Sequence, residues 1–209
     1  METPDFSSRT PRRRGDTVAG VNTNATTPVE SAVRPLNESL ALAGRAIDLL
    51  RTPGALLNLT TAEAACVVAQ MKLVRYPAGV TLFREGDDTQ LDYMLLLLAG
   101  EVSVDTGGAG RRGAVAISVI GPGSVIGEMA LLDGAPRSAS CTTLSPVNAA
   151  GLSRQGLGLL IDEQPRTAAK LIMGLSVRTA ERLRALGDQL QMYAELVEQQ
   201  QGEIERLRR

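Results

Sequence analysis

The sequence predicts a mainly β domain with flanking helices: a small antiparallel β-barrel or jelly roll, preceded by an N-terminal helical segment and followed by a long C-terminal coiled-coil helix. Three observations predict this fold class. Short β-rich runs separated by Gly- and Pro-containing turns fill residues 75–153. Apolar residues recur every three or four positions on either side of that region, as on one face of a helix. A heptad repeat then occupies the end of the chain.

The chain begins with a polar region, residues 1–37, rich in Ser, Thr, Pro, Gly, Asn and Arg. Its few apolar residues cannot bury enough surface to offset the entropy lost on ordering, so we expect a disordered tail. The basic cluster "RTPRRRGDT" at 9–17 has two interpretations, a solubilising patch or a docking or inhibitory segment for a partner. Short basic clusters are common in tails, which favours the first.

Residues 38–74 are predicted to form the N-terminal helical segment. A first helix over 38–51 ends at the Thr-Pro-Gly that follows it. The apolar face of this helix consists of Leu40, Ala43, Ile47 and Leu50. A second helix is predicted over 60–74, with Thr60 or Thr61 as its N-cap.

The β region, residues 75–153, contains one interruption that is not β-like. The segment "GEMALLD" at 127–133 predicts a short helix between two strands. Residues 154–209 turn helical again. A short helix ends before Pro165, and a long one begins there.

The long helix carries the heptad repeat. Its a positions are Leu183, Leu190, Val197 and Ile204, and its d positions are Leu186, Tyr193, Gln200 and Leu207. An amphipathic helix lying on its own domain is the alternative interpretation. The narrow two-position seam, with little else left to cover it, favours a parallel coiled coil and hence a homodimer through 183–207.

The composition narrows the function. The net charge is −1, so no overall field draws the protein to nucleic acid or to a membrane. The sequence has no His, the commonest general base and metal ligand, so we expect neither an enzyme nor a metal site. We interpret Cys66 and Cys141 as small buried hydrophobes in a reducing compartment. With no signal peptide and no membrane-length apolar run, we expect a cytoplasmic protein.

The segment "VIGEMALLDGAPRSAS" at 125–140 places one acid, Glu128, and one base, Arg137, among small and apolar residues. A helix beginning at Gly127 would present unpaired backbone N–H groups, which bind anions. The planar fork of Arg137 suits a phosphate, and Glu128 can accept hydrogen bonds from hydroxyls. The pattern indicates a ligand with one phosphate and a neighbouring hydroxyl, which a ribose cyclic phosphate provides.

This segment resembles the phosphate-binding cassette of the cyclic nucleotide-binding domain family, which includes the catabolite activator protein and protein kinase A regulatory subunits. The flanking runs "YPAGVTLFREGD", "YMLLLLAGEVSV", "VIGPGSVIGE" and "LIDEQP" are also similar to family segments, so the resemblance covers roughly residues 55–195. It implies that 75–153 is a nucleotide-binding β-barrel core with its cassette at 125–140.

The resemblance also implies the site residues. Glu128 would bind the ribose 2′-hydroxyl, Arg137 the exocyclic phosphate oxygens, and Ser138 the phosphate or a guanine. An ungapped alignment from Pro165 places base contacts near Thr179, Arg182 and Leu183, where Arg182 would stack on the purine. The predicted ligand-binding residues are therefore Gly127, Glu128, Met129, Ala130, Arg137, Ser138, Ala139 and Arg182.

Three classes of function follow for such a domain. A ligand-gated transcription factor needs a DNA-reading element after the long helix; the sequence shows no such segment after the coiled coil, so we expect no DNA-binding domain. An enzyme is disfavoured because no paired carboxylates or nucleophile–base set is present. We expect a stand-alone dimeric sensor that binds cAMP and signals to a protein partner. The alternatives are a cGMP-binding protein and a ligand-free scaffold, and a kinase-type regulatory subunit is less favoured.

Overall fold

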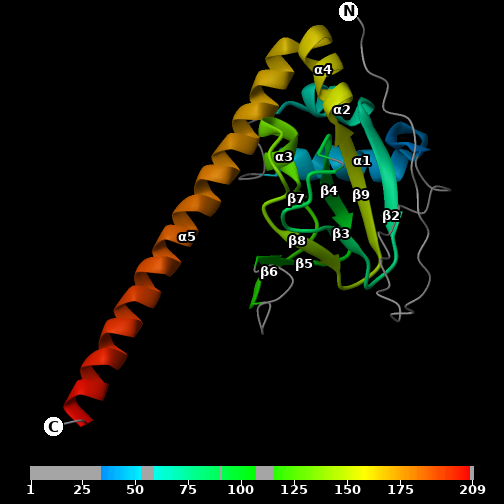
Figure 1. Ribbon diagram of the computed structural model, residues 1–209. Helices are drawn as coiled ribbons and strands as arrows, with labels where there is room; N and C mark the ends of the chain where they lie inside the picture. The colour runs from blue at the N-terminus through cyan, green and yellow to red at the C-terminus, as the bar shows by residue number, and fades with distance from the viewer. Residues whose placement is uncertain (1–33, 53–58, 90, 107–114, 208–209) are drawn as a thin grey trace, which may run out of the picture.

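A computed structural model describes residues 34–52, 59–89, 91–106 and 115–207 (Figure 1). The basic cluster at 9–17 and most of the expected tail lie outside these residues. The described residues from Arg34 include part of the region expected as a tail, residues 34–37; here Leu36 is fully buried in the core. None of the described helices is long and apolar enough to span a bilayer.

Two antiparallel sheets form the centre of the molecule. The first contains, in spatial order, β1 (Arg34–Pro35), β2 (Met71–Tyr76), β9 (Val147–Ser153), β4 (Tyr93–Ala99) and β7 (Val125–Ile126). The second contains β3 (Thr81–Phe83), β8 (Ser140–Thr143), β5 (Val102–Thr106) and β6 (Val115–Ile120). No ladder joins the two sheets among the described strands, so the fold is jelly-roll-like and not a closed barrel.

Six helices accompany the sheets in the described chain. They are η2 (Leu36–Glu38), α1 (Leu40–Arg51), α2 (Thr61–Ala69), α3 (Glu128–Asp133), α4 (Arg154–Glu163) and α5 (Pro165–Leu207). The predicted short helix within the β region and the two C-terminal helices are confirmed. In Figure 1, α1 and α2 lie against the sheet that contains β2, β9 and β4.

Strand β4 separates two apolar clusters, which explains its continuous apolar sequence. Met94, Leu96 and Leu98 face the cluster shared with the helices. Leu95 and Leu97 face the cluster between the two sheets. All five side chains are buried, because both faces of this strand are covered.

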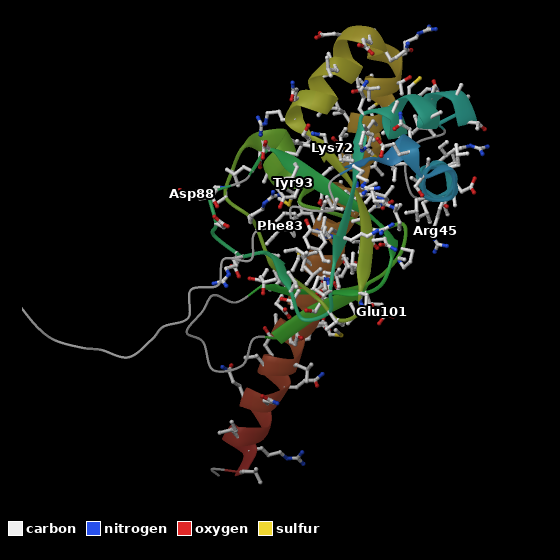
Figure 2. The ribbon with its side chains drawn as sticks, turned by 90° about the vertical axis from the view of Figure 1, so that its right-hand side faces the viewer. Arg45, Lys72, Phe83, Asp88, Tyr93 and Glu101 are labelled. Carbon is white, nitrogen blue, oxygen red and sulfur yellow. The ribbon has the colours of Figure 1, made fainter. Side chains whose placement is uncertain are left out.

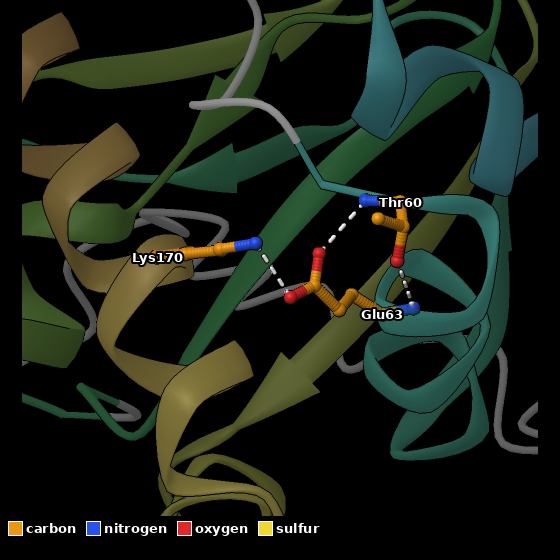
Figure 3. Close-up of polar contacts among 3 residues, drawn as sticks. All are labelled: Thr60, Glu63 and Lys170. Carbon is orange, nitrogen blue, oxygen red and sulfur yellow. Dashed lines mark hydrogen bonds and ion pairs between the residues drawn. The ribbon is translucent and has the colours of Figure 1, made fainter.

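The N-cap of α2 is Thr60, one of the two residues predicted for this position. The Thr60 hydroxyl accepts from the Glu63 backbone N–H at 3.2 Å, and the Thr60 N–H donates to Glu63 Oε2 at 2.8 Å (Figure 3). The other oxygen of Glu63 accepts from Lys170 Nζ at 2.6 Å. One carboxylate therefore completes a capping box and ties α2 to α5.

Two expectations for the N-terminal helical segment are corrected. The second helix does not reach residue 74: α2 ends at Ala69, and Met71–Tyr76 pairs with β9 along its length. Met71, Leu73 and Tyr76 are buried while Lys72 and Arg75 are exposed, a near-alternating pattern that suits an antiparallel strand. Leu40 is not on the buried face of α1; it is 86% exposed at the first helical position.

Helix α5 is a single element of 43 residues with two different halves. Ala168, Leu171 and Leu175 are buried against the domain. Every described side chain from 181 onward is exposed, and the helix extends away from the domain (Figure 1). The apolar heptad residues lie in this exposed half; Leu183 and Leu190 are each 70% exposed.

Candidate functional site

The chain enters the candidate site at the turn from β7 into α3. Gly127 precedes the helix with φ of +77°, a left-handed conformation that favours glycine. A Cβ at this position would lie 2.5 Å from Arg137 Nη1 and 3.0 Å from Phe83 Cζ. Glycine is therefore required here both by the backbone conformation and by the close approach of the arginine.

Arg137 returns to the start of α3 after a turn that begins at Gly134, where φ is +71°. Its side chain is only 4% exposed. Nη1 donates to the carbonyl of Gly127 at 2.9 Å, and Nη2 donates to the carbonyl of Tyr93 at 3.1 Å. These two hydrogen bonds therefore orient the guanidinium between the segments that contain Gly127 and Tyr93.

The electrostatic environment of Arg137 combines burial with the charge of two carboxylates. Burial lowers the pKa of Arg137, while Asp87 and Asp92 favour its charged form. Because an arginine pKa starts far above neutrality, the side chain remains a cation. Burial also raises the pKa of the Cys141 thiol to about 12, so this cysteine is uncharged at neutral pH.

Glu128 begins α3 and is 5% exposed. Its Oε1 lies 3.5 Å from Nη1 of Arg182, whose side chain is 46% exposed. Among the described residues, Glu128 and Arg137 are the only charged side chains that are buried. Charged side chains are seldom buried in a protein core, so these two residues mark the place where a polar ligand would be stabilised.

A small cavity of about 30 Å³ lies between these side chains. Its lining residues are Phe83, Val104, Ile126, Gly127, Glu128, Met129, Ala130, Arg137, Ser138, Ala139, Cys141 and Arg182. All eight residues predicted from the sequence are in this set. Phe83, Val104, Ile126 and Cys141 are the four that sequence reasoning missed.

A second cavity, of about 320 Å³, lies beside the first and shares Glu128 and Arg182 with it. It is also lined by Ser124, Arg178 and Glu181. Sites for small molecules usually exceed about 300 Å³, so the first cavity alone is too small for a nucleotide. The ion pair between Glu128 and Arg182 borders both cavities.

The three predicted base-contact positions on α5 are not equivalent. Arg182 lines both cavities, but its guanidinium faces Glu128. The Thr179 hydroxyl donates to the carbonyl of Leu175 in its own helix, and Leu183 is 70% exposed; neither lines these cavities. Arg178, which was not predicted, lines the larger cavity and donates to the carbonyl of Gly123 at 3.2 Å.

A two-sheet jelly roll that presents a buried acid and a buried base at a cavity beside a long helix is suited to binding a small polar ligand. The chain belongs to the cyclic nucleotide-binding domain family: the family model matches residues 73–164, which include the cassette. The resemblance inferred from the sequence is thus confirmed. In the described residues, no group of three or more His, Cys, Asp or Glu side chains is placed to hold a metal ion.

Two known proteins similar to this chain are named as a regulator and a regulatory subunit. A CRP-like cAMP-activated global transcriptional regulator of Mycobacterium tuberculosis is 27% identical over 143 residues, 68% of this chain and 61% of the regulator. A cAMP-dependent protein kinase regulatory subunit of Colletotrichum orbiculare is 31% identical over 54% of this chain and 28% of the subunit. The chain therefore matches less than two thirds of either relative.

The fold is also similar to solved structures. The crystal structure of a cyclic nucleotide-binding domain from Methylobacillus flagellatus has a TM-score of 0.63 and 30% sequence identity. The match covers 71% of this chain and 82% of that domain. The similarity supports the mainly β fold with flanking helices described above.

Proposed function

We propose that the protein is a regulatory sensor that binds a 3′,5′-cyclic nucleotide, with cAMP as the ligand. The observation that carries this proposal is the burial of Glu128 and Arg137 at one cavity, as the only buried charges among the described residues. Relatives named as cAMP-activated or cAMP-dependent regulators, rather than catalysts, support both the ligand and the non-enzymatic role.

The proposed contacts follow from the chemistry of the lining residues. The Arg137 fork binds the phosphate oxygens, because a planar guanidinium matches two oxygens at once. Glu128 accepts a hydrogen bond from the ribose 2′-hydroxyl. Gly127, Met129 and Ala130 offer backbone groups at the start of α3, and the small side chain of Ala139 leaves room for the ligand.

The ion pair between Glu128 and Arg182 suggests how binding is transmitted. A ribose hydroxyl that binds the Glu128 carboxylate would compete with Arg182, whose Nη1 lies 3.5 Å from Glu128 Oε1. Displaced from the carboxylate, the guanidinium can stack on the purine in the adjoining cavity. The ligand thus favours one arrangement of α5 over another by its differential affinity for the two.

The identity of the purine base distinguishes cAMP from cGMP, the second candidate ligand. Ser138 is exposed beside the cavity, and its hydroxyl lies 3.5 Å from Met129 Sδ, a weak acceptor. A hydroxyl bound so weakly is available to a guanine as well as to a phosphate. This observation makes cGMP the alternative to cAMP.

The proposed output is a change in a protein partner, transmitted by a homodimer. The exposed heptad face of α5 supports a parallel coiled coil between two copies through 183–207. A ligand-free scaffold that uses the same dimer is the competing interpretation. The free cysteines Cys66 and Cys141 are compatible with the proposed cytoplasmic location.

Calorimetric titration of the purified protein with cAMP, cGMP and cyclic di-GMP tests the proposal. We expect heat with cAMP, weaker binding of cGMP, and none with cyclic di-GMP. Arg137→Ala should weaken cAMP binding by at least about 30-fold, since truncating one member of a buried charge pair costs about 2 kcal/mol or more. The matched control, Arg75→Ala on the exposed side of β2, should bind as the wild type does. If none of the three ligands produces heat, the proposal is wrong and the ligand-free scaffold becomes the favoured interpretation.

A further inference from the structure

The side chain of Arg137 lies between two aromatic rings as well as two carbonyl groups. Its Cζ is 3.9 Å from the centroid of the Phe83 ring and 5.1 Å from that of the Tyr93 ring. The two rings are themselves 5.5 Å apart with an interplanar angle of 45°. Figure 2 shows Phe83 and Tyr93 side by side within the domain.

Both distances are within the range of about 6 Å in which a cation is attracted to the negative face of an aromatic ring. The attraction increases when the cation is shielded from water, and Arg137 and Phe83 are 4% and 5% exposed. Rings and carbonyl groups carry no net charge. They therefore orient the guanidinium without supplying a formal negative charge that would compete with a phosphate.

We propose that Phe83 and Tyr93 are positioning residues that hold the Arg137 fork for the phosphate by cation–π contact. This inference rests on the proposed function, because it concerns the arginine assigned to the phosphate. The rings come from β3 and from the start of β4, so the arginine of the cassette is fixed by both sheets. Without the rings, the guanidinium would have to be reordered each time the ligand binds.

The test compares variants that keep or remove a ring. Phe83→Leu and Tyr93→Leu should each weaken cAMP binding by about 3- to 30-fold, the range expected for loss of a shielded cation–π contact. Tyr93→Phe keeps the ring and should bind as the wild type does. Phe83→Tyr is unsuitable, because its hydroxyl would extend from Cζ toward Gly127.

A matched control separates positioning from general loss of stability. Tyr76 is buried in the same cluster between the sheets, and no cation–π contact joins it to Arg137 among the described residues. Tyr76→Leu should lower the urea midpoint without weakening cAMP binding in the folded protein. If Phe83→Leu and Tyr93→Leu lower only the midpoint, or if Tyr93→Phe binds as weakly as Tyr93→Leu, the inference is wrong.

A double-mutant cycle tests the contact when no nucleotide is present. Phe83→Leu, Arg137→Met and the double variant are compared by urea unfolding of the ligand-free protein. We expect the double variant to lose less stability than the sum of the single losses. Additive losses would overturn the inference. If the wild type binds none of the nucleotides, the proposed function fails, and the cycle still decides whether the rings hold the arginine.

Discussion

Glu128 and Arg182 form the one ion pair that joins the cassette helix α3 to the long helix α5 in the described chain, with Nη1 and Oε1 3.5 Å apart. The carboxylate is buried, and the guanidinium is half-exposed at the border of two cavities. A ligand that binds the Glu128 carboxylate would compete with this contact between α3 and α5. We therefore propose that Arg182 couples occupancy of the site to the position of α5.

Substitution of Arg182 separates its two proposed roles. With ribose 3′,5′-cyclic phosphate, which lacks a base, Arg182→Ala should bind about two- to fivefold more tightly than the wild type, because a competing ion pair is gone. In Arg182→Ala, the ratio of the affinity for cAMP to the affinity for the base-less ligand should fall by a similar factor, because the purine loses its stacking partner. Calorimetry with both ligands measures the two effects. Arg184→Ala, exposed on the same helix, is the control; unchanged affinity of Arg182→Ala for both ligands would contradict both roles.

Gly127→Ala should damage both stability and binding. A side chain at φ of +77° costs about 1–2 kcal/mol, and the new Cβ would lie 2.5 Å from Arg137 Nη1. Displacement of the arginine should weaken cAMP binding by more than tenfold, by calorimetry. Gly158→Ala is the matched control, since a Cβ there meets nothing within 4 Å and lies in α4, so stability should be unchanged or higher. If Gly127→Ala binds cAMP with wild-type affinity, the glycine is not needed to position Arg137.

Leu190→Lys should separate the proposed dimer. Leu190 is at an a position and is 70% exposed in the single chain, so a lysine there would place two like charges at the centre of the seam. Light scattering should show the mass fall to that of one 22.1 kDa chain. Glu195→Lys, on the opposite face of the helix, should leave the mass unchanged. If the protein remains a dimer after deletion of residues 187–209, the dimer interface lies elsewhere.

The contact between Glu63 and Lys170 should make part of the stability dependent on pH. The hydrogen bond from Lys170 lowers the pKa of Glu63 from its ordinary value of 4.5. A carboxyl with a lowered folded pKa contributes stability above its ordinary pKa, and this contribution is lost as the pH falls through the folded value. Glu63→Gln should therefore lower the Tm by no more than a few degrees at pH 7.

The difference in Tm between wild type and Glu63→Gln should narrow as the pH falls below 4.5. Thermal unfolding followed by circular dichroism from pH 7 to pH 3 measures it. Glu38→Gln, an exposed carboxyl on η2, should give no comparable difference. A constant difference across this range would mean that the effect does not come from the charge of Glu63.

The cassette and the long helix could be predicted because their information is local. Gly127, Glu128 and Arg137 lie within eleven residues, and each type has a distinct chemistry that packing alone does not explain. The heptad repeat is likewise a pattern of one continuous segment. The eight predicted residues lie at one cavity. The pairing of Arg182 with Glu128 depends on how α5 packs against the domain and could not be predicted.

The parts that could not be predicted depend on distant contacts. Phe83 and Tyr93 resemble ordinary core residues in sequence, and only the pairing of their strands brings them to Arg137. Residues 71–74 are predicted to continue the second helix, because their apolar residues follow directly on those of α2; pairing with β9 makes Met71–Tyr76 a strand. Whether two sheets close into a barrel is likewise decided by contacts between remote strands.

The length of α5 gives it the properties of a lever. At 1.5 Å per residue, Arg182 lies about 26 Å and Leu207 about 63 Å from Pro165 along the helix axis. A helix that pivots at Pro165 would therefore multiply a displacement at Arg182 by about 2.5 at its far end. A displacement of about 1 Å at Arg182 would then move Leu207 by about 2.5 Å.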